Sequence, residues 1–169
     1  HQLSTECKDK GMEVLVEIHT HYETQIKIAE SVDWVYDFAL PPLVLYSIFS
    51  GDAKPLQNWL EISPKNCITV LDTHDGIGVI DVGPDGEKTG LLTEPQIDYL
   101  VETMHLKTQG ESQEATGAAA KNVDLYQVNS TYYSALGCVD SDYLLARAIQ
   151  LFAPGIPQIY YVGLLAGAN

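Results

Sequence analysis

The chain has 169 residues, of which 46% are hydrophobic and 19% are charged, a composition typical of a folded globular domain. Acidic residues outnumber basic residues 23 to 9, which gives a formal net charge of -14. Nucleic acids are bound by clustered lysine and arginine side chains, so this charge balance excludes a nucleic-acid partner.

The cysteines and the two ends of the sequence indicate where in the cell the protein is expected. The three cysteines are odd in number and widely spaced, so they predict neither a disulfide framework nor a zinc site. The first residues lack the basic start and apolar core of a signal peptide, and we expect a cytoplasmic protein with reduced thiols. Residues 148–169 carry no charge, but Pro154 and Pro157 interrupt them. We therefore expect a buried strand there and no membrane span.

Apolar periodicity predicts helices and strands that alternate along the chain. Helices are expected over residues 1–10, 20–30, 42–49, 55–62, 93–106 and 142–152, with Ser141 as the N-cap of the last. Strands are expected over residues 12–16, 32–38, 67–71 and 158–162. Alternating units predict a parallel sheet with right-handed crossovers. Four strands are half of a (β/α)₈ barrel, so we expect an α/β fold that is a partial TIM barrel with two open strand edges.

The apolar strands stop between residues 79 and 138. We interpret that stretch as an insertion on the rim of the barrel, because long βα loops are where such folds vary. The expected organisation is therefore residues 1–78 with three strands and their helices, residues 79–138 as the insertion, and residues 139–169 with the last helix and strand.

The third predicted strand ends abruptly in ionisable residues. Asp72, Thr73, His74 and Asp75 follow it, and then come two glycines that let the backbone turn sharply. Barrel enzymes keep their chemistry at the carboxyl ends of the strands. The alternative is a structural loop whose aspartates cap backbone N–H groups, and for Asp72 we favour this structural role.

Two carboxylates are expected to meet on one rim. Glu17 follows the first strand and Asp75 follows the third. Cleavage of a glycosidic bond needs one carboxyl group to protonate the leaving oxygen, while another faces an oxocarbenium-like transition state as an anion. His74 could hydrogen-bond sugar hydroxyls, and Tyr126 and Tyr132 offer amphipathic contact surfaces.

A second chemistry would use the same rim. Metal-dependent barrel hydrolases bind a divalent ion with histidines and an acid at such a rim. In this chain those residues would be His19 and His21, with His74 and Asp75 nearby. For His21 the alternative is a solvated residue in the first turn of a helix. Spacing alone does not decide between the two chemistries.

Five stretches of sequence, in this order, cover most of the chain. They are EIH at residues 17–19, VYDFALPP at 35–42, VLDTHDGIGVID at 70–81, GESQ at 110–113 with DLYQVNSTYYSALG at 124–137, and PGIPQIYYVG at 154–163. Together they resemble the sucrose phosphorylases, of the bifidobacterial type, in glycoside hydrolase family 13 of the α-amylase clan. By this resemblance the predicted strands are about strands 5–8 of the barrel. The insertion then follows strand 7 and holds a small B′-like domain and a mobile loop.

The resemblance implies a retaining glycosyltransferase that converts sucrose and phosphate into α-D-glucose 1-phosphate and fructose through a covalent glucosyl-enzyme. It implies that Glu17 is the general acid/base, Asp75 the transition-state stabiliser and His74 its sugar-binding neighbour. His19 would line the acceptor site.

The resemblance also implies a mobile substrate loop. Asp124, Tyr126 and Gln127 fall on a loop that alternates between fructose and phosphate, and the small residues 116–120 would give it conformational freedom. The family needs no metal ion and no cofactor, and inorganic phosphate is a co-substrate. A homodimer is implied for the full-length protein.

One departure from the family is serious. The family's nucleophilic aspartate ends strand 4, before residue 1, and nothing in the chain replaces it. Arg147, the only arginine, is expected on a helix and is a poor substitute for an arginine that neutralises phosphate. We therefore expect the 169 residues alone to be inactive.

Two alternatives to a sucrose phosphorylase stay open. One is a related phosphorylase that acts on sucrose 6-phosphate, glucosylglycerol or glucosylglycerate. Residues 113–126 contain no base except Lys121, which favours unphosphorylated sucrose. The other is a non-catalytic half-barrel that binds sugar.

Overall fold

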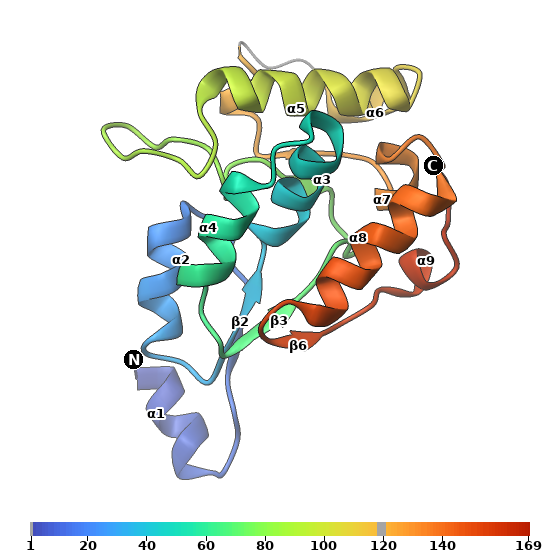
Figure 1. The fold of residues 1–169 in the computed structure, drawn as a ribbon. Helices are drawn as coiled ribbons and strands as arrows, with labels where there is room; N and C mark the ends of the chain where they lie inside the picture. Colours follow the sequence, from blue (N-terminus) through green and yellow to red (C-terminus); the bar gives the residue numbers. More distant parts are fainter. Residues whose placement is uncertain (1, 118–120) are drawn as a thin grey trace.

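The chain folds around a parallel sheet (Figure 1). The computed structural model describes residues 2–117 and 121–169, so part of the expected small-residue loop 116–120 lies outside the described residues. The sheet has the order β1-β2-β3-β6, and its strands are β1 (Leu15–Val16), β2 (Trp34–Asp37), β3 (Cys67–Thr69) and β6 (Ile156–Pro157). The helices between the strands are α2 (Tyr22–Ala29), α3 (Leu40–Ser50), α4 (Lys54–Ile62) and α8 (Asp140–Phe152), and α1 (Gln2–Asp9) precedes β1. The predicted α/β fold is confirmed.

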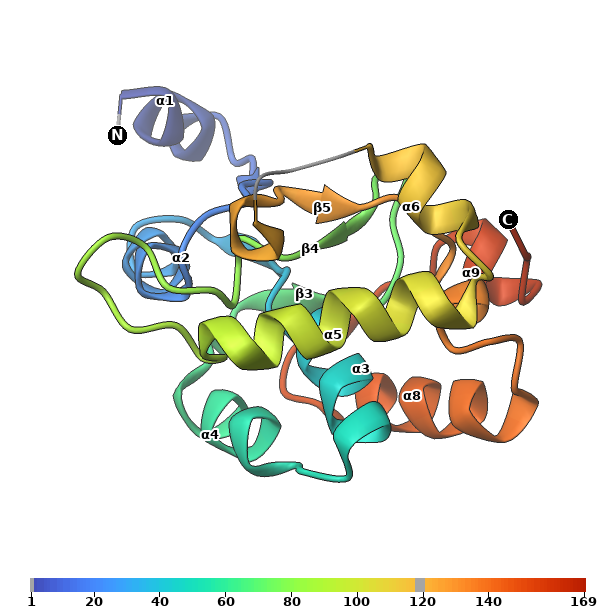
Figure 2. The ribbon, with the colours of Figure 1, turned by 90° about the horizontal axis from the view of Figure 1, so that it is seen from above.

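The stretch between β3 and α8 forms a second group of elements. It holds β4 (Ile77–Gly78), α5 (Glu94–Lys107), α6 (Glu111–Thr116), η1 (Asn122–Asp124), β5 (Gln127–Val128) and α7 (Tyr132–Ala135). Strands β4 and β5 pair antiparallel, apart from the main sheet. Helix α5 lies across the top of the molecule in Figure 1, on the near side in Figure 2, and contacts α3. A capping box of Thr93 and Gln96 starts α5, close to the predicted boundary.

Helix α3 forms the centre of the core. Its first seven residues, Leu40–Tyr46, are all buried, so the helix has no polar face over that length. A helix that is apolar all round must be covered on every side. Helices α4, α5 and α8 all contact α3 and provide that cover.

Both edges of the sheet are open, as expected of half a barrel. Strands β1 and β6 each have one neighbour among the described strands. Helix α8 also exposes apolar side chains, and Phe152 is 90% accessible. Unpaired strand edges and wet apolar helix surfaces are the features that a completed barrel would cover. Within the described part of the chain, no helix has both the length and the apolar character needed to cross a bilayer.

The fourth strand was predicted in the wrong place. Strand β6 is Ile156–Pro157, whereas the end of the predicted strand 158–162 lies in helix α9 (Tyr161–Leu164). Strand β6 pairs with Ile68 and Thr69, and β3 ends at Thr69. Residues beyond Gln158 therefore have no strand to pair with, although their apolar composition resembles that of a buried strand.

The last long helix also begins earlier than predicted. Helix α8 starts at Asp140 with Val139 as the N-cap, rather than with Ser141 at the cap. Gly137 and Cys138 have positive φ values of 74° and 56°, so the chain turns sharply between α7 and α8. The hydroxyl of Tyr133 donates to Asp140 at 2.6 Å and fixes the first turn.

A buried acid links β2 to two helices. Asp37 ends β2 and accepts hydrogen bonds from Trp59 Nε1 on α4 at 3.0 Å and from the backbone N–H of Leu40 at 3.0 Å. Burial raises the pKa of Asp37 from its ordinary value of 3.8 to about 6, and the Trp59 hydrogen bond opposes that rise. Folding therefore favours the protonated form of this carboxyl group.

The Asp37 pKa predicts how stability depends on pH. Because the folded-state pKa is raised, its stabilising contribution is present below pH 3.8 and is lost as the pH rises through 6. A rise from 3.8 to about 6 corresponds to roughly 3 kcal/mol. We expect Asp37→Asn, which keeps an oxygen acceptor, to be more stable than the wild type at pH 8 by up to that amount, with the gain shrinking toward pH 4.

Urea unfolding of the purified protein at pH 4, 6 and 8 measures this difference. The exposed Asp98 on α5 gives the matched control, since Asp98→Asn should leave the pH profile unchanged. Parallel stability profiles for wild type and Asp37→Asn would contradict the assignment.

Candidate functional site

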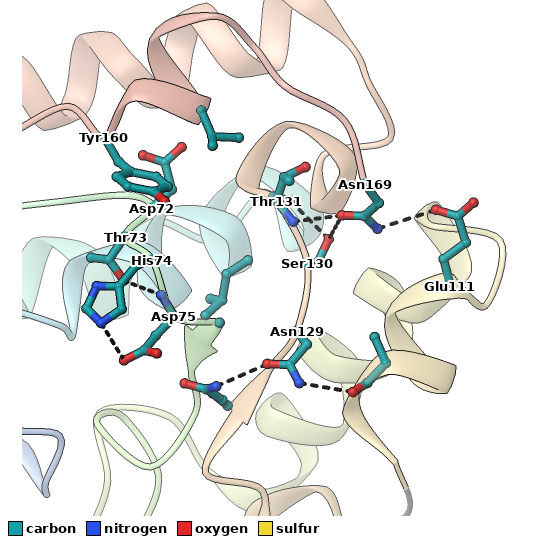
Figure 3. A pocket seen from close by; sticks show the side chains of 15 residues that line it. Asp72, Thr73, His74, Asp75, Glu111, Asn129, Ser130, Thr131, Tyr160 and Asn169 are labelled. Atoms are coloured by element: carbon teal, nitrogen blue, oxygen red, sulfur yellow. Dashed lines mark hydrogen bonds and ion pairs between the residues drawn. The ribbon is translucent and has the colours of Figure 1, made fainter.

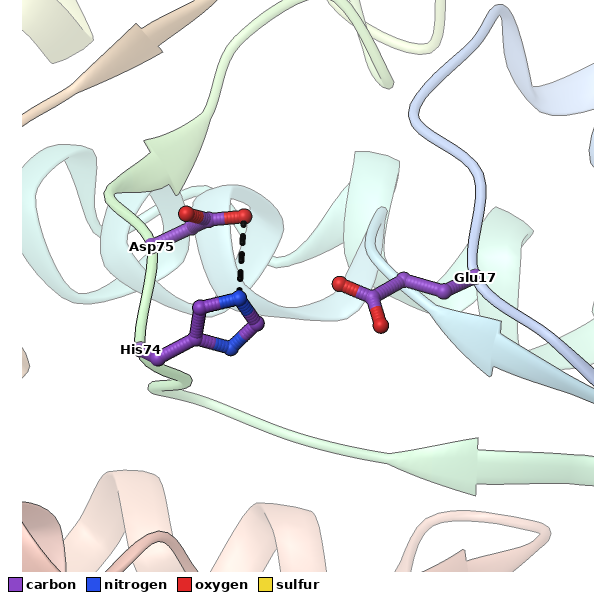
Figure 4. Close-up of side chains that lie close together, drawn as sticks. All are labelled: Glu17, His74 and Asp75. Atoms are coloured by element: carbon purple, nitrogen blue, oxygen red, sulfur yellow. Dashed lines mark ion pairs between the residues drawn. The ribbon is translucent and has the colours of Figure 1, made fainter.

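Three side chains from two strand ends meet on one side of the sheet. Glu17 directly follows β1, while His74 and Asp75 lie beyond β3. One ligand atom from each residue lies within 4.8 Å of those of the other two, and Figure 4 shows the Glu17 carboxylate facing His74 and Asp75. The expected meeting of Glu17 and Asp75 is confirmed. All three residues are exposed, so the cluster is open to a ligand.

Local contacts hold the turn that carries Asp75. The backbone N–H of Asp75 donates to Thr73 Oγ1 at 3.1 Å, and His74 Nε2 lies 3.8 Å from Asp75 Oδ2. Gly76 passes so close to β5 that an added Cβ would lie 2.7 Å from the Val128 carbonyl oxygen. The turn therefore needs glycine at this position for close approach rather than for backbone conformation.

Asp72 makes a structural contact, but with an arginine side chain and not with the backbone N–H groups of the alternative above. Its Oδ2 accepts a hydrogen bond from Arg147 on α8 at 2.6 Å in a largely buried ion pair. Burial raises the pKa of Asp72, and the Arg147 charge opposes the rise. Arg147 also donates to Gln150 and to Tyr143, whose hydroxyl in turn donates to the Gly163 carbonyl. The arginine is thus fully engaged and ties the β3 end to α8.

A pocket of about 730 Å³ lies beside the cluster (Figure 3). His74 and Asp75 line one part of it, and Asn129 and Asn169 line another. Asn169 Oδ1 accepts the backbone N–H of Thr131 at 2.8 Å, which holds the end of the chain against the pocket. Glu17 lies outside this pocket and, with His74, lines a small hollow of about 50 Å³.

His19 is removed from the exposed cluster. Its ring stacks on Phe38 with centroids 3.8 Å apart, and its Nδ1 lies 2.8 Å from Asp81 Oδ2. The other ring nitrogen, Nε2, is buried and has no hydrogen-bond partner. Burial raises the pKa of Asp81, and the hydrogen bond with His19 opposes that rise.

The metal alternative loses two of its histidines. His21 is buried, not solvated as the sequence suggested. Its Nδ1 accepts the Glu23 N–H as the N-cap of α2, and its Nε2 contacts the Thr89 carbonyl. His19 is engaged by Asp81. Glu17, His74 and Asp75 could still approach a cation, but exposed acidic groups often cluster without one.

The three residues predicted on the mobile loop, Asp124, Tyr126 and Gln127, lie in different surroundings. Asp124 is exposed in η1 and lines a separate pocket with Thr20 and Lys121. The Tyr126 ring stands edge-on to His19 at 5.2 Å. Burial raises the pKa of Tyr126, and the negative charges of Asp81, Asp75 and Glu17 add to the rise.

Gln127, the third loop candidate, lines the pocket in Figure 3. Its Nε2 donates to Asn129 Oδ1 at 3.0 Å, while its Oε1 is buried without a partner. In this arrangement Gln127 lines the pocket of Figure 3 and Tyr126 adjoins His19, while Asp124 lines a separate pocket.

Sequence reasoning did not single out Asp81, Asn129 or Asn169. Asp81 lies within the VLDTHDGIGVID stretch, so the motif contained it without showing its role. Asn129 and Asn169 act through loop contacts that no periodicity reveals.

Comparison with known proteins agrees with the resemblance. No family model matches the chain. It is 66% identical to a sucrose phosphorylase of Agrobacterium vitis and 57% identical to one of Bifidobacterium adolescentis, in each case over 99% of the chain. The identity to the bifidobacterial protein is thus lower than to the Agrobacterium protein. A solved structure of sucrose 6F-phosphate phosphorylase from Thermoanaerobacter thermosaccharolyticum matches with a TM-score of 0.80 and 38% identity over 99% of the chain.

These matches cover only part of each relative. The chain spans 35% and 34% of the two curated proteins and 34% of the solved chain. The parallel sheet therefore corresponds to part of a larger phosphorylase chain. Over almost its whole length the chain is similar to sucrose phosphorylases, and it spans about one third of the length of the relatives it matches.

Proposed function

We propose that the protein containing this chain is a retaining sucrose phosphorylase that converts sucrose and phosphate into α-D-glucose 1-phosphate and fructose. The observation that carries the proposal is the meeting of Glu17, His74 and Asp75 within 4.8 Å at the carboxyl ends of β1 and β3. The high identity to sucrose phosphorylases supports it.

The mechanism assigns a separate task to each carboxyl group. Glu17 protonates the glycosidic oxygen as fructose leaves and later takes the proton of the attacking phosphate. Asp75 stays anionic and stabilises the positive charge of the transition state. The nucleophile that forms the glucosyl-enzyme comes from outside these 169 residues.

Substrate groups contact the remaining polar residues. His74 hydrogen-bonds hydroxyls of the glucose ring, while His19, Tyr126 and Gln127 contact the acceptor. The only loop base, Lys121, lines the separate pocket with Asp124, which supports unphosphorylated sucrose over sucrose 6-phosphate. We propose that the reaction needs no metal ion and no cofactor. We also propose that the full-length protein is a homodimer in the cytoplasm.

Glu17→Gln in the full-length protein tests the acid/base role. We expect kcat with sucrose to fall about 10²–10⁴-fold, because the leaving oxygen is no longer protonated. Fluoride leaves without protonation, so the loss with α-D-glucosyl fluoride should be much smaller. Phosphate-dependent formation of glucose 1-phosphate measures both rates. Glu102→Gln on α5 is the matched control, and an equal loss with both substrates would exclude the acid role.

Asp75→Asn tests the stabilising charge. We expect a loss of about 10²–10³-fold with sucrose and with α-D-glucosyl fluoride alike, because the charge acts on the sugar and not on the leaving group. The same assay measures it, with Asp98→Asn as control. Recovery of activity with the fluoride would assign Asp75 to leaving-group chemistry instead.

The 169 residues by themselves should release no glucose 1-phosphate from sucrose and phosphate, because a glucosyl-enzyme needs the missing nucleophile. A coupled glucose 1-phosphate assay on the purified chain, beside the full-length protein, measures this. Turnover by the chain alone would place the nucleophile within it.

A further inference from the structure

A buried hydrogen-bonded pair lies behind the exposed cluster. The side chains of His19 and Asp81 are 6% and 0% accessible. His19 Nδ1 lies 2.8 Å from Asp81 Oδ2, and the imidazole ring stacks on Phe38 with the ring centroids 3.8 Å apart. The nitrogen not engaged by Asp81, Nε2, is buried and unpartnered. Such a polar atom is costly to leave unsatisfied, and a ligand would satisfy it.

The surroundings of Asp81 fix which of its atoms are acceptors. Its Oδ1 lies 3.2 Å from the Thr20 backbone N–H and 2.8 Å from Gln25 Nε2. Gln25 Nε2 also donates to the Thr20 carbonyl at 2.8 Å, so the Gln25 amide cannot turn over without losing that bond. Asp81 Oδ1 therefore faces two donors, and only an oxygen acceptor fits there.

The absence of a side chain at Gly78 leaves the space that the His19–Asp81 pair occupies. A Cβ at Gly78 would lie 2.1 Å from Asp81 Oδ2 and 3.1 Å from His19 Nδ1. Asp81 cannot move away, because its other oxygen is held by Thr20 and Gln25. The structure thus reserves space for the contact between the two side chains.

We infer that Asp81 is a positioning residue that fixes the His19 tautomer, so that Nδ1 carries the hydrogen and Nε2 is presented as a bare acceptor to a sugar hydroxyl. A carboxylate that accepts from one ring nitrogen determines the state of the other. A bare nitrogen accepts from a hydroxyl of fructose but cannot donate to an oxygen of phosphate. The inference rests on the proposed function, and it makes His19 a group that favours fructose over phosphate at the acceptor site.

The Tyr126 ring lies beside His19. It stands edge-on to the imidazole ring at 5.2 Å, and the Tyr126 residue itself is 51% exposed. Because Nε2 is buried, a sugar hydroxyl can reach it only if side chains around His19 move.

Asp81→Asn reverses the hydrogen bond. The amide oxygen of the variant must face Thr20 and Gln25, so its NH₂ faces His19 Nδ1 and donates to it. The ring then carries its hydrogen on Nε2. Long-range ¹H–¹⁵N spectra of histidine-labelled full-length protein read the tautomer directly, with His19→Gln to assign the signals. We expect a protonated Nδ1 in the wild type and a protonated Nε2 in Asp81→Asn.

Kinetics provide the second readout. We expect Asp81→Asn to raise KM for fructose in sucrose synthesis about tenfold, the effect of one lost hydrogen bond, and to leave KM for phosphate within twofold. Gly78→Ala should act in the same direction, and Asp81→Asn should have no further effect in a His19→Phe background. Asp37→Asn, an equally buried acid that does not contact His19, is the matched control and should change neither KM.

Failure of this inference and failure of the proposed function give different results. Protonated Nε2 in the wild type, an unchanged tautomer in Asp81→Asn, or equal rises of both KM values would overturn the inference. A full-length wild type that does not turn over sucrose and phosphate would overturn the proposed function, and the spectra would still decide the tautomer.

Discussion

A parallel sheet delivers the carboxyl end of every strand to the same side, and the candidate site depends on this constraint. Glu17 and Asp75 are far apart in sequence, yet each follows a strand that is held in parallel register through β2. An antiparallel arrangement would have placed them at opposite ends. Gly76 and the hydrogen bond from the Asp75 N–H to Thr73 shape the turn that carries the Asp75 side chain.

Acidic residues near these strand ends fall into two groups that differ in burial. Asp37, Asp72 and Asp81 are enclosed and hydrogen-bonded to Trp59, Arg147 and His19 respectively. Glu17 and Asp75 are exposed, and one carboxylate oxygen of each lies within 4.8 Å of the other. Buried carboxylates need fixed donors, so the first group holds the framework rigid. The second group stays free to meet a ligand.

The sequence predicted the features that follow from local pattern. Strands β1 to β3 and helix α5 lie near their expected positions, and the meeting of Glu17 with Asp75 followed from strand topology. Properties that depend on distant partners were not predictable. Whether residues 158–162 pair depends on where β3 ends, and the burial of His21 depends on a carbonyl sixty-eight residues away. The role of Asp81 likewise depends on Gln25 and Gly78, whose positions no local pattern reveals.

The charges around the pocket determine which kind of ligand the described residues suit. Among the described residues that line the pocket in Figure 3 and the hollow beside Glu17, none is a lysine or arginine. Arg147, though nearby, is neutralised by Asp72. A phosphate dianion beside Glu17 and Asp75 would meet only negative charge here, which costs free energy unless cations approach from elsewhere. The described residues around the pocket and the hollow therefore suit a neutral, hydroxyl-bearing ligand better than an anion.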